Sequence, residues 1–245
     1  MHILVRETRS LDDVESAVDL GQTPAELVFL SFSDSDLGAA SAAWQADPNL
    51  PGLRLANLAR LKHPLSVDLY VEQVIENARC VVIRLLGGLD YWRYGAEEVA
   101  RTCRDRDIPL AILPGDGRED DRLIELSTVS GKARDRLDAC LAHGGPANTA
   151  RALRFAAHIA GLGPDDGEAA EPLPMHGEYR VPVPFDTARP LAVIVFYRAY
   201  LLAADLAPID ALARELDRQG LDVRALHVAS LKGPETVDFV ARTLR

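Results

Sequence analysis

Cysteine is scarce in this sequence, and its spacing does not suggest a disulfide framework or a metal site. The 245 residues include three cysteines, which lie far apart at Cys80, Cys103 and Cys140. Zinc sites and disulfide-rich folds need closely spaced or even-numbered cysteines. We therefore expect these thiols to be small buried side chains.

Hydrophobic runs long enough to cross a bilayer are also absent. No apolar segment approaches the ~20 residues that a membrane-spanning helix needs, and the opening MHILVRETRS lacks the apolar stretch of a signal peptide. The composition, with 48% hydrophobic and 26% charged residues, is that of a globular protein. We expect a cytoplasmic protein with no membrane contact.

Positive charge is in deficit. Lys and Arg number 27 against 37 Asp and Glu, a net charge of −10, and no basic cluster is present. Because clustered basic residues attract a phosphate backbone, we do not expect nucleic acid as a partner. The six histidines show no HxH, HxxxH or HExxH spacing, so no metal site is predicted.

Nucleotide fingerprints and complete catalytic sets are missing as well. Neither GxGxxG nor GxxxxGK[ST] occurs, which argues against a small nucleotide- or flavin-dependent enzyme. No GxSxG elbow or Ser-His-Asp arrangement can be assembled, so we assign no catalytic residue.

What the sequence does contain is an alternation of apolar strand-like runs and amphipathic helices. Strands are predicted at 3–7, 26–33, 80–86 and 108–116, while 52–61 fits a strand or a helix. Helices are predicted after Ser10, in the Ala-rich segment 34–47, over 64–78 with Ser66 as its cap, around 96–103, and at 119–126, 132–142 and 145–160. This order predicts a flavodoxin-like, doubly wound parallel α/β domain over residues 1–162.

A second unit follows a proline-rich stretch. Residues 163–190 hold six prolines and little periodicity, and we interpret them as a connector. Residues 191–245 contain a strand, a helix, a strand and the start of another helix. One βαβ unit cannot cover both faces of its strands, so we expect an incomplete second α/β domain, either part of a longer protein or completed by another chain.

The candidate site lies where the loops after the strands converge, at the carboxyl ends of the first sheet. Aromatic side chains concentrate there beside two glycines, and they offer flat apolar surface with polar edges. Packing of these rings onto the sheet rim is the alternative. The candidate contact residues in this part of the chain are His63, Arg84, Gly87, Gly88, Tyr91, Trp92 and Tyr94.

Acidic residues gather in the same loops. A phospho-acceptor or magnesium site and a set of solvated surface carboxylates both fit this pattern, and we favour the second. The residues are Asp34, Asp36, Asp116, Glu119, Asp120 and Asp121.

Two longer stretches carry a family signal. They are NLARLKHPLSVDLYVEQVIENARCVVIRLLGGLDYWRYG (57–95) and VIVFYRAYLLAADLAPIDALARELDRQGLDVRALHVASLKGPE (193–235). With HPLSVDLYVE, RLLGGxxYWxYG, VFYR and SLKxPE in this order, the sequence resembles the N-terminal part of the large subunit of aerobic cobaltochelatase, the CobN family, which is related to the magnesium chelatase H subunit. The VFYR motif adds Tyr197 and Arg198 to the candidate contacts.

The resemblance implies a share in ATP-dependent cobalt insertion into hydrogenobyrinic acid a,c-diamide, a nitrogen–metal ligase step of cobalamin biosynthesis. It implies as partners a corrin-ring substrate, an AAA+ ATPase subunit and an integrin-I-domain-like subunit, with cobalt and ATP with magnesium needed by the complete complex. The family subunit is several times longer, so we expect the catalytic centre elsewhere and this piece to be inactive alone, serving substrate enclosure or subunit contact.

The sequence departs from the family pattern in its second unit. Asp205 and Leu206 stand where Asn-Thr is common, and Gly233 stands where Asp is usual. These changes weaken any polar site there. The alternative function is a stand-alone flavodoxin-like binding or regulatory module without chelatase activity.

Overall fold

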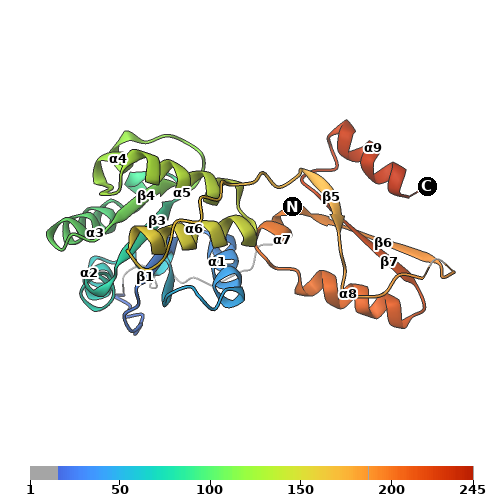
Figure 1. Ribbon diagram of the computed structural model, residues 1–245, viewed down its shortest axis with the longest axis horizontal. Helices are drawn as coiled ribbons and strands as arrows, with labels where there is room; N and C mark the ends of the chain where they lie inside the picture. The colour runs from blue at the N-terminus through green and yellow to red at the C-terminus, as the bar shows by residue number, and fades with distance from the viewer. Residues whose placement is uncertain (1–15, 187, 245) are drawn as a thin grey trace.

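The computed structural model describes residues 16–186 and 188–244. Two parts follow each other along the chain, each built on its own sheet (Figure 1). The strand expected at 3–7 and the helix expected after Ser10 lie outside the described residues.

The first sheet has four parallel strands in the order β2-β1-β3-β4. This is the start of the 2-1-3-4-5 order of flavodoxin-like folds and confirms the predicted fold class. The ambiguous run at 52–61 is a strand followed by a short 3₁₀ helix, η2 (Leu58–Arg60). The strands are β1 (Leu27–Ser31), β2 (Leu53–Asn57), β3 (Cys80–Leu85) and β4 (Leu110–Pro114).

Helices cover both faces of this sheet, because alternate residues of each buried strand point to opposite sides. On β3, Val81 and Ile83 pack into one core, and Cys80 and Val82 pack into the other. The first face is covered by α2 (Pro64–Gln73), α3 (Arg93–Asp105) and α4 (Asp121–Leu126). The second is covered by α1 (Asp34–Ala46), α5 (Gly131–His143) and α6 (Gly145–Ile159).

The cap of α2 differs from the prediction. His63 caps this helix, because its Nδ1 accepts a hydrogen bond from the Leu65 N–H at 3.1 Å and Pro64 fits the first helical position. Ser66 lies inside the helix, where its hydroxyl accepts a hydrogen bond from the Val18 N–H. The helix ends at Gln73, and the 3₁₀ helix η3 (Ile75–Asn77) continues the predicted apolar face.

The second sheet has three strands in the order β5-β7-β6. The strands β6 (Leu191–Tyr197) and β7 (Asp222–Val228) are parallel, joined through α7 (Arg198–Leu202) and α8 (Ala207–Arg218), and α9 (Pro234–Thr243) follows. The third strand, β5 (His176–Tyr179), pairs antiparallel with β7 and comes from the stretch expected to be a connector. Its four residues are only partly buried and lie among prolines, so periodicity gave no signal for a strand.

The residues Ile209 and Ala213 bury the apolar face of α8 against Ile194 and Val223 of the second sheet. The short helix α7 lies between the two sheets (Figure 1). Within the described part of the chain, no helix is both long and apolar enough to cross a membrane.

Candidate functional site

The predicted contact residues fall in three places rather than one. The aromatic loop after β3 lies on the α2–α3 side, and the side chain of Arg84 lies on the α1–α6 side. Tyr197 and Arg198 lie at the end of β6 in the second sheet.

The loop after β3 turns through two glycines. Gly87 and Gly88 have φ angles of 88° and 78°, which only glycine adopts without strain, and the 3₁₀ helix η4 (Leu89–Tyr91) follows. A Cβ added at Gly87 would lie 2.6 Å from the Tyr91 ring, so this ring sits directly on the glycine backbone. The glycines therefore allow the Tyr91 ring to pack on the backbone of the loop. Tyr91 is nevertheless 68% exposed.

Trp92 belongs to the core and not to the surface. Its side chain is 5% exposed, and its indole Nε1–H donates a 2.7 Å hydrogen bond to the Leu61 carbonyl. A buried indole with its only donor paired is a packing residue. This corrects the prediction of Trp92 as a contact residue, since the sequence did not distinguish it from its exposed neighbours.

Tyr94 is held in place by a charged partner. Its hydroxyl donates a 2.7 Å hydrogen bond to Asp68 Oδ1 on α2, and this bond raises the pKa of Tyr94 to about 12. The ring is 43% exposed. Asp68 was not predicted as part of the site, because it is 26 residues away in the sequence.

An exposed leucine lies near Tyr94. Leu65 lies one helical turn before Asp68, the hydrogen-bond partner of Tyr94, and is 49% exposed. We call Leu65, Tyr91 and Tyr94 the aromatic rim. It presents apolar surface with two phenol hydroxyls.

His63 is half-buried at the start of α2, where its Nδ1 serves as the helix cap. Only its Nε2 is left for another ligand. The structure thus gives His63 a structural role.

Several of the loop carboxylates are paired within the protein. Asp120 accepts hydrogen bonds from the Arg122 side chain, which lower the pKa of Asp120 to about 2, and from the Leu89 N–H. Arg122 also pairs with Asp90. Across the described residues no group of three potential metal ligands is found. This arrangement fits surface carboxylates in ion pairs and gives no support to a magnesium site.

Arg84 lies on the other face of the sheet. Its guanidinium NH1 donates to Asp36 Oδ1 at 2.7 Å, and the side chain is 14% exposed. The Ser31 hydroxyl donates to the other carboxylate oxygen of Asp36. Arg84 therefore does not contribute to the aromatic rim, because successive residues of a strand point to opposite faces.

Tyr197 and Arg198, the two predicted contact residues of the second sheet, have different surroundings. Tyr197 is 48% exposed, while the Arg198 guanidinium donates to the carbonyls of Leu173 and Pro174 at 2.9 and 3.0 Å. Arg198 thus holds the segment before β5 against the end of β6.

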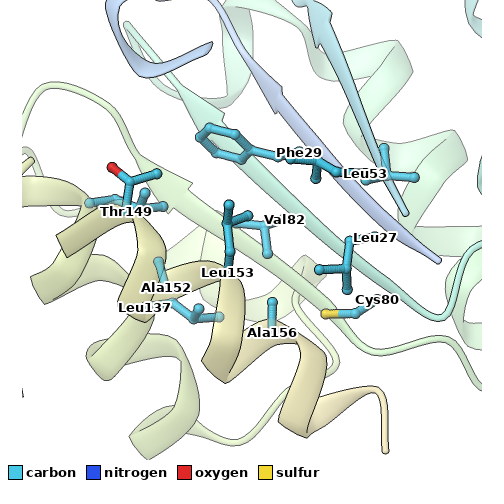
Figure 2. A pocket seen from close by; sticks show the side chains of 12 residues that line it. Leu27, Phe29, Leu53, Cys80, Val82, Leu137, Thr149, Ala152, Leu153 and Ala156 are labelled. Atoms are coloured by element: carbon cyan, nitrogen blue, oxygen red, sulfur yellow. The ribbon is translucent and has the colours of Figure 1, made fainter. Parts of the chain in front are cut away.

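One cavity is enclosed in the core of the first sheet, between the sheet and α6 (Figure 2). It measures about 10 Å³ and is lined almost entirely by apolar side chains, among them Phe29, Val82 and Leu153. A water needs roughly that volume together with two or more polar partners. The cavity is a packing gap and not a binding site.

The order of motifs and the two-sheet architecture agree with known proteins. The sequence model of the family described as CobN/Magnesium Chelatase matches residues 138–244. The chain is similar to CobN. Aerobic cobaltochelatase subunit CobN of a Sinorhizobium species is 33% identical over 97% of this chain, and that of Pseudomonas aeruginosa is 35% identical over 95%.

A solved structure confirms the fold. The catalytic subunit of cobaltochelatase from Mycobacterium tuberculosis aligns with 88% of this chain at a TM-score of 0.72 and 26% identity. The chain spans about a fifth of the length of the CobN sequences, 20% and 19%, and 17% of the solved chain. The similarity therefore concerns one part of a much larger subunit.

Proposed function

We propose that this chain is the part of a CobN-type chelatase that helps to enclose the corrin-ring substrate or to contact a partner subunit, through the aromatic rim. The complete activity would be ATP-dependent insertion of cobalt into hydrogenobyrinic acid a,c-diamide in the cytoplasm. Similarity to CobN along nearly the whole chain supports the family part of this proposal.

The role proposed for the aromatic rim is based on one observation: Tyr91 and Tyr94 are exposed and yet held in place. Neither ring is needed to fill the core, yet one rests on Gly87 and the other is hydrogen bonded to Asp68. Pre-positioned aromatic surface lowers the entropy cost of binding a flat ligand or a partner side chain.

In this proposal, metal delivery and proton removal are carried out by parts of the complex outside this chain. Insertion requires groups that transfer the ion and bases that accept two pyrrole protons. Among the described residues, no three potential metal ligands come together. Asp90 is paired with Arg122, and Asp68 accepts a hydrogen bond from Tyr94. An AAA+ ATPase subunit with bound ATP and magnesium, together with an integrin-I-domain-like subunit, would complete the complex, and this chain alone would be inactive.

The test is a binding assay of the chain against the corrin substrate and, in parallel, against the two ATPase-type subunits. Trp92 is buried and directly follows Tyr91, and in a Trp44→Phe background it is the only tryptophan, so its fluorescence reports ligand binding at the rim. We expect Tyr91→Ala to weaken binding of one of these ligands at least ten-fold, a loss of about 1.4 kcal/mol.

Phe185→Ala is the matched control, because Phe185 is 54% exposed and lies outside the rim. Equal binding by Tyr91→Ala and the parent chain would refute the role of the rim. Failure of the parent chain to bind substrate or either subunit would favour the stand-alone binding module, whose ligand would then be sought separately.

A further inference from the structure

A second cavity, of about 210 Å³, lies at the carboxyl edge of the first sheet on the side opposite the aromatic rim. Its walls include Ser35 and Asp36 of α1, Arg84 of β3, Gly145 of α6 and Leu202 of α7. The second part of the chain contributes to its wall through α7, which lies between the two sheets (Figure 1).

The position of this cavity follows from the strand order. In the order β2-β1-β3-β4 the connections leave β1 in one direction and β3 in the other, so the order reverses between these two neighbours. Open parallel sheets bind their ligands in the crevice at such a switch point. The cavity occupies this crevice, because it is lined by the start of α1, after β1, and by the end of β3.

Arg84 supplies the cavity with unused hydrogen-bond donors. Its NH1 donates to Asp36, and its Nε is buried without a hydrogen-bond partner among the described residues. A guanidinium has five N–H donors, and an unpaired buried donor is costly. A small movement of the Arg84 side chain would bring this donor to an anion in the cavity and meet this need.

The carboxylates near Arg84 leave room for such an anion. Both oxygens of Asp36 are engaged, one by Arg84 and the other by the Ser31 hydroxyl. Asp138 on α5 is half-buried, and burial raises its pKa while Arg84 acts in the opposite direction. Asp36 thus fixes the guanidinium without using up its donors.

The remaining walls are small and apolar. They are formed mainly by Ala39, Leu141, Ala199 and Leu202. At roughly 30 Å³ for each water in the liquid, the cavity corresponds to about seven waters, the size of a small organic acid. Its chemistry is the Arg84–Asp36 ion pair, with guanidinium donors to spare, beside an aliphatic wall.

We propose that this cavity binds a small aliphatic carboxylate, held by Arg84 and packed against the alanine and leucine wall. A planar carboxylate matches the guanidinium fork and can accept two of its N–H groups. The group can belong to a free acid or to an acid side chain of a larger molecule. This inference does not rest on the function proposed for the aromatic rim.

The test is NMR of the ¹⁵N-labelled 245-residue chain, following the Nε–H signal of Arg84. Sodium propionate is the probe and propionamide its uncharged counterpart of the same shape; inorganic phosphate and a porphyrin bearing propionate side chains are further arms. We expect a saturable shift with propionate and none with propionamide. A shift with the porphyrin but not with propionate would still support a carboxylate site and identify its source as a larger molecule.

Two variants keep the test decisive. Arg84→Gln should weaken propionate binding at least ten-fold, followed through backbone signals at the start of α1. If that variant does not fold, Ala199→Phe replaces it, because Ala199 is exposed and lines the cavity, so that a larger ring blocks the space with the Arg84–Asp36 pair intact. Arg118→Gln is the matched control, since Arg118 is 88% exposed and lines no part of the cavity.

Equal shifts with propionate and propionamide would overturn the proposal, as would unchanged propionate binding in a folded Arg84→Gln or Ala199→Phe chain. Binding of phosphate with no response to either carboxylate would overturn the ligand class. Tyr91→Ala should leave the propionate response intact, which separates a failure here from a failure at the rim.

Discussion

The glycine at position 95 gives the sharpest test of how the rim is supported. Gly95 lies in α3, one turn after Trp92, and has no positive φ. In an isolated helix Gly→Ala would stabilise by about 1 kcal/mol, because alanine has the higher helix propensity. Helix propensity alone therefore predicts a more stable protein.

The packing around Gly95 predicts the opposite sign. The three atoms nearest to an added Cβ all belong to the Trp92 ring, and the farthest of them would be 2.7 Å away. The ring is buried and cannot move outward freely, so overpacking costs about 1–3 kcal/mol. Displacing the indole also weakens its hydrogen bond to Leu61, worth about 1 kcal/mol. After subtracting the propensity gain, we expect Gly95→Ala to destabilise by about 1–3 kcal/mol.

Urea unfolding of Gly95→Ala measures this free energy directly. Gly131→Ala is the matched control, because Gly131 begins α5 with open space around its Cβ position, and it should be neutral or stabilising by up to about 1 kcal/mol. In a Trp92→Phe background the cost of Gly95→Ala should shrink, since the smaller ring leaves room. A neutral or stabilising Gly95→Ala in the parent chain would refute the packing argument.

Three further predictions concern ionisable groups. The pKa of Asp120 in the folded protein is about 2, below its ordinary value, so its stabilising effect is present above pH ~4 and is lost as the pH falls toward 2. In denaturant titrations, the difference in unfolding free energy between the parent and Asp120→Asn should therefore vanish over that pH range. Tyr94, with a pKa of about 12, contributes stability below pH ~10 that is lost as the pH rises through 12, and Asp68→Asn should lower this pKa toward 10 in ultraviolet titrations referenced to Tyr94→Phe. Thiol reagents should modify the native protein slowly and the unfolded chain rapidly, because all three cysteines are buried and burial raises their pKa values: Cys80, Cys103 and Cys140.

The parallel strands of the first sheet could be predicted because each is a continuous apolar run between helical patterns. β3 matches the run predicted at 80–86, and α6 matches the helix predicted at 145–160, each within one residue. β5 could not be predicted in this way. Its residues HGEY have no strand periodicity, and they form a strand because β7 offers an unpaired edge.

The candidate site was predictable in its place but not in its contacts. The strand order puts the loops after β1 and β3 at one edge, and the local concentration of aromatics in 91–94 is visible in the sequence. Whether a ring faces solvent depends on partners far along the chain. Trp92 is buried because Leu61 supplies an acceptor for its indole N–H, and Tyr94 is fixed because Asp68 faces it from another helix.

The sequence by itself therefore determined the doubly wound class, the order of most strands and helices in the described part, and the similarity to CobN, because these depend on local periodicity and on motif order. Only the tertiary structure decided which aromatic side chains are exposed. It also decided that Arg84 pairs with Asp36 at a separate cavity and is not part of the aromatic rim. The physical reason is the alternation of side chains along β3. Residues adjacent in sequence face opposite sides of the sheet, so Arg84 and the aromatic loop that follows β3 lie on different sides of it.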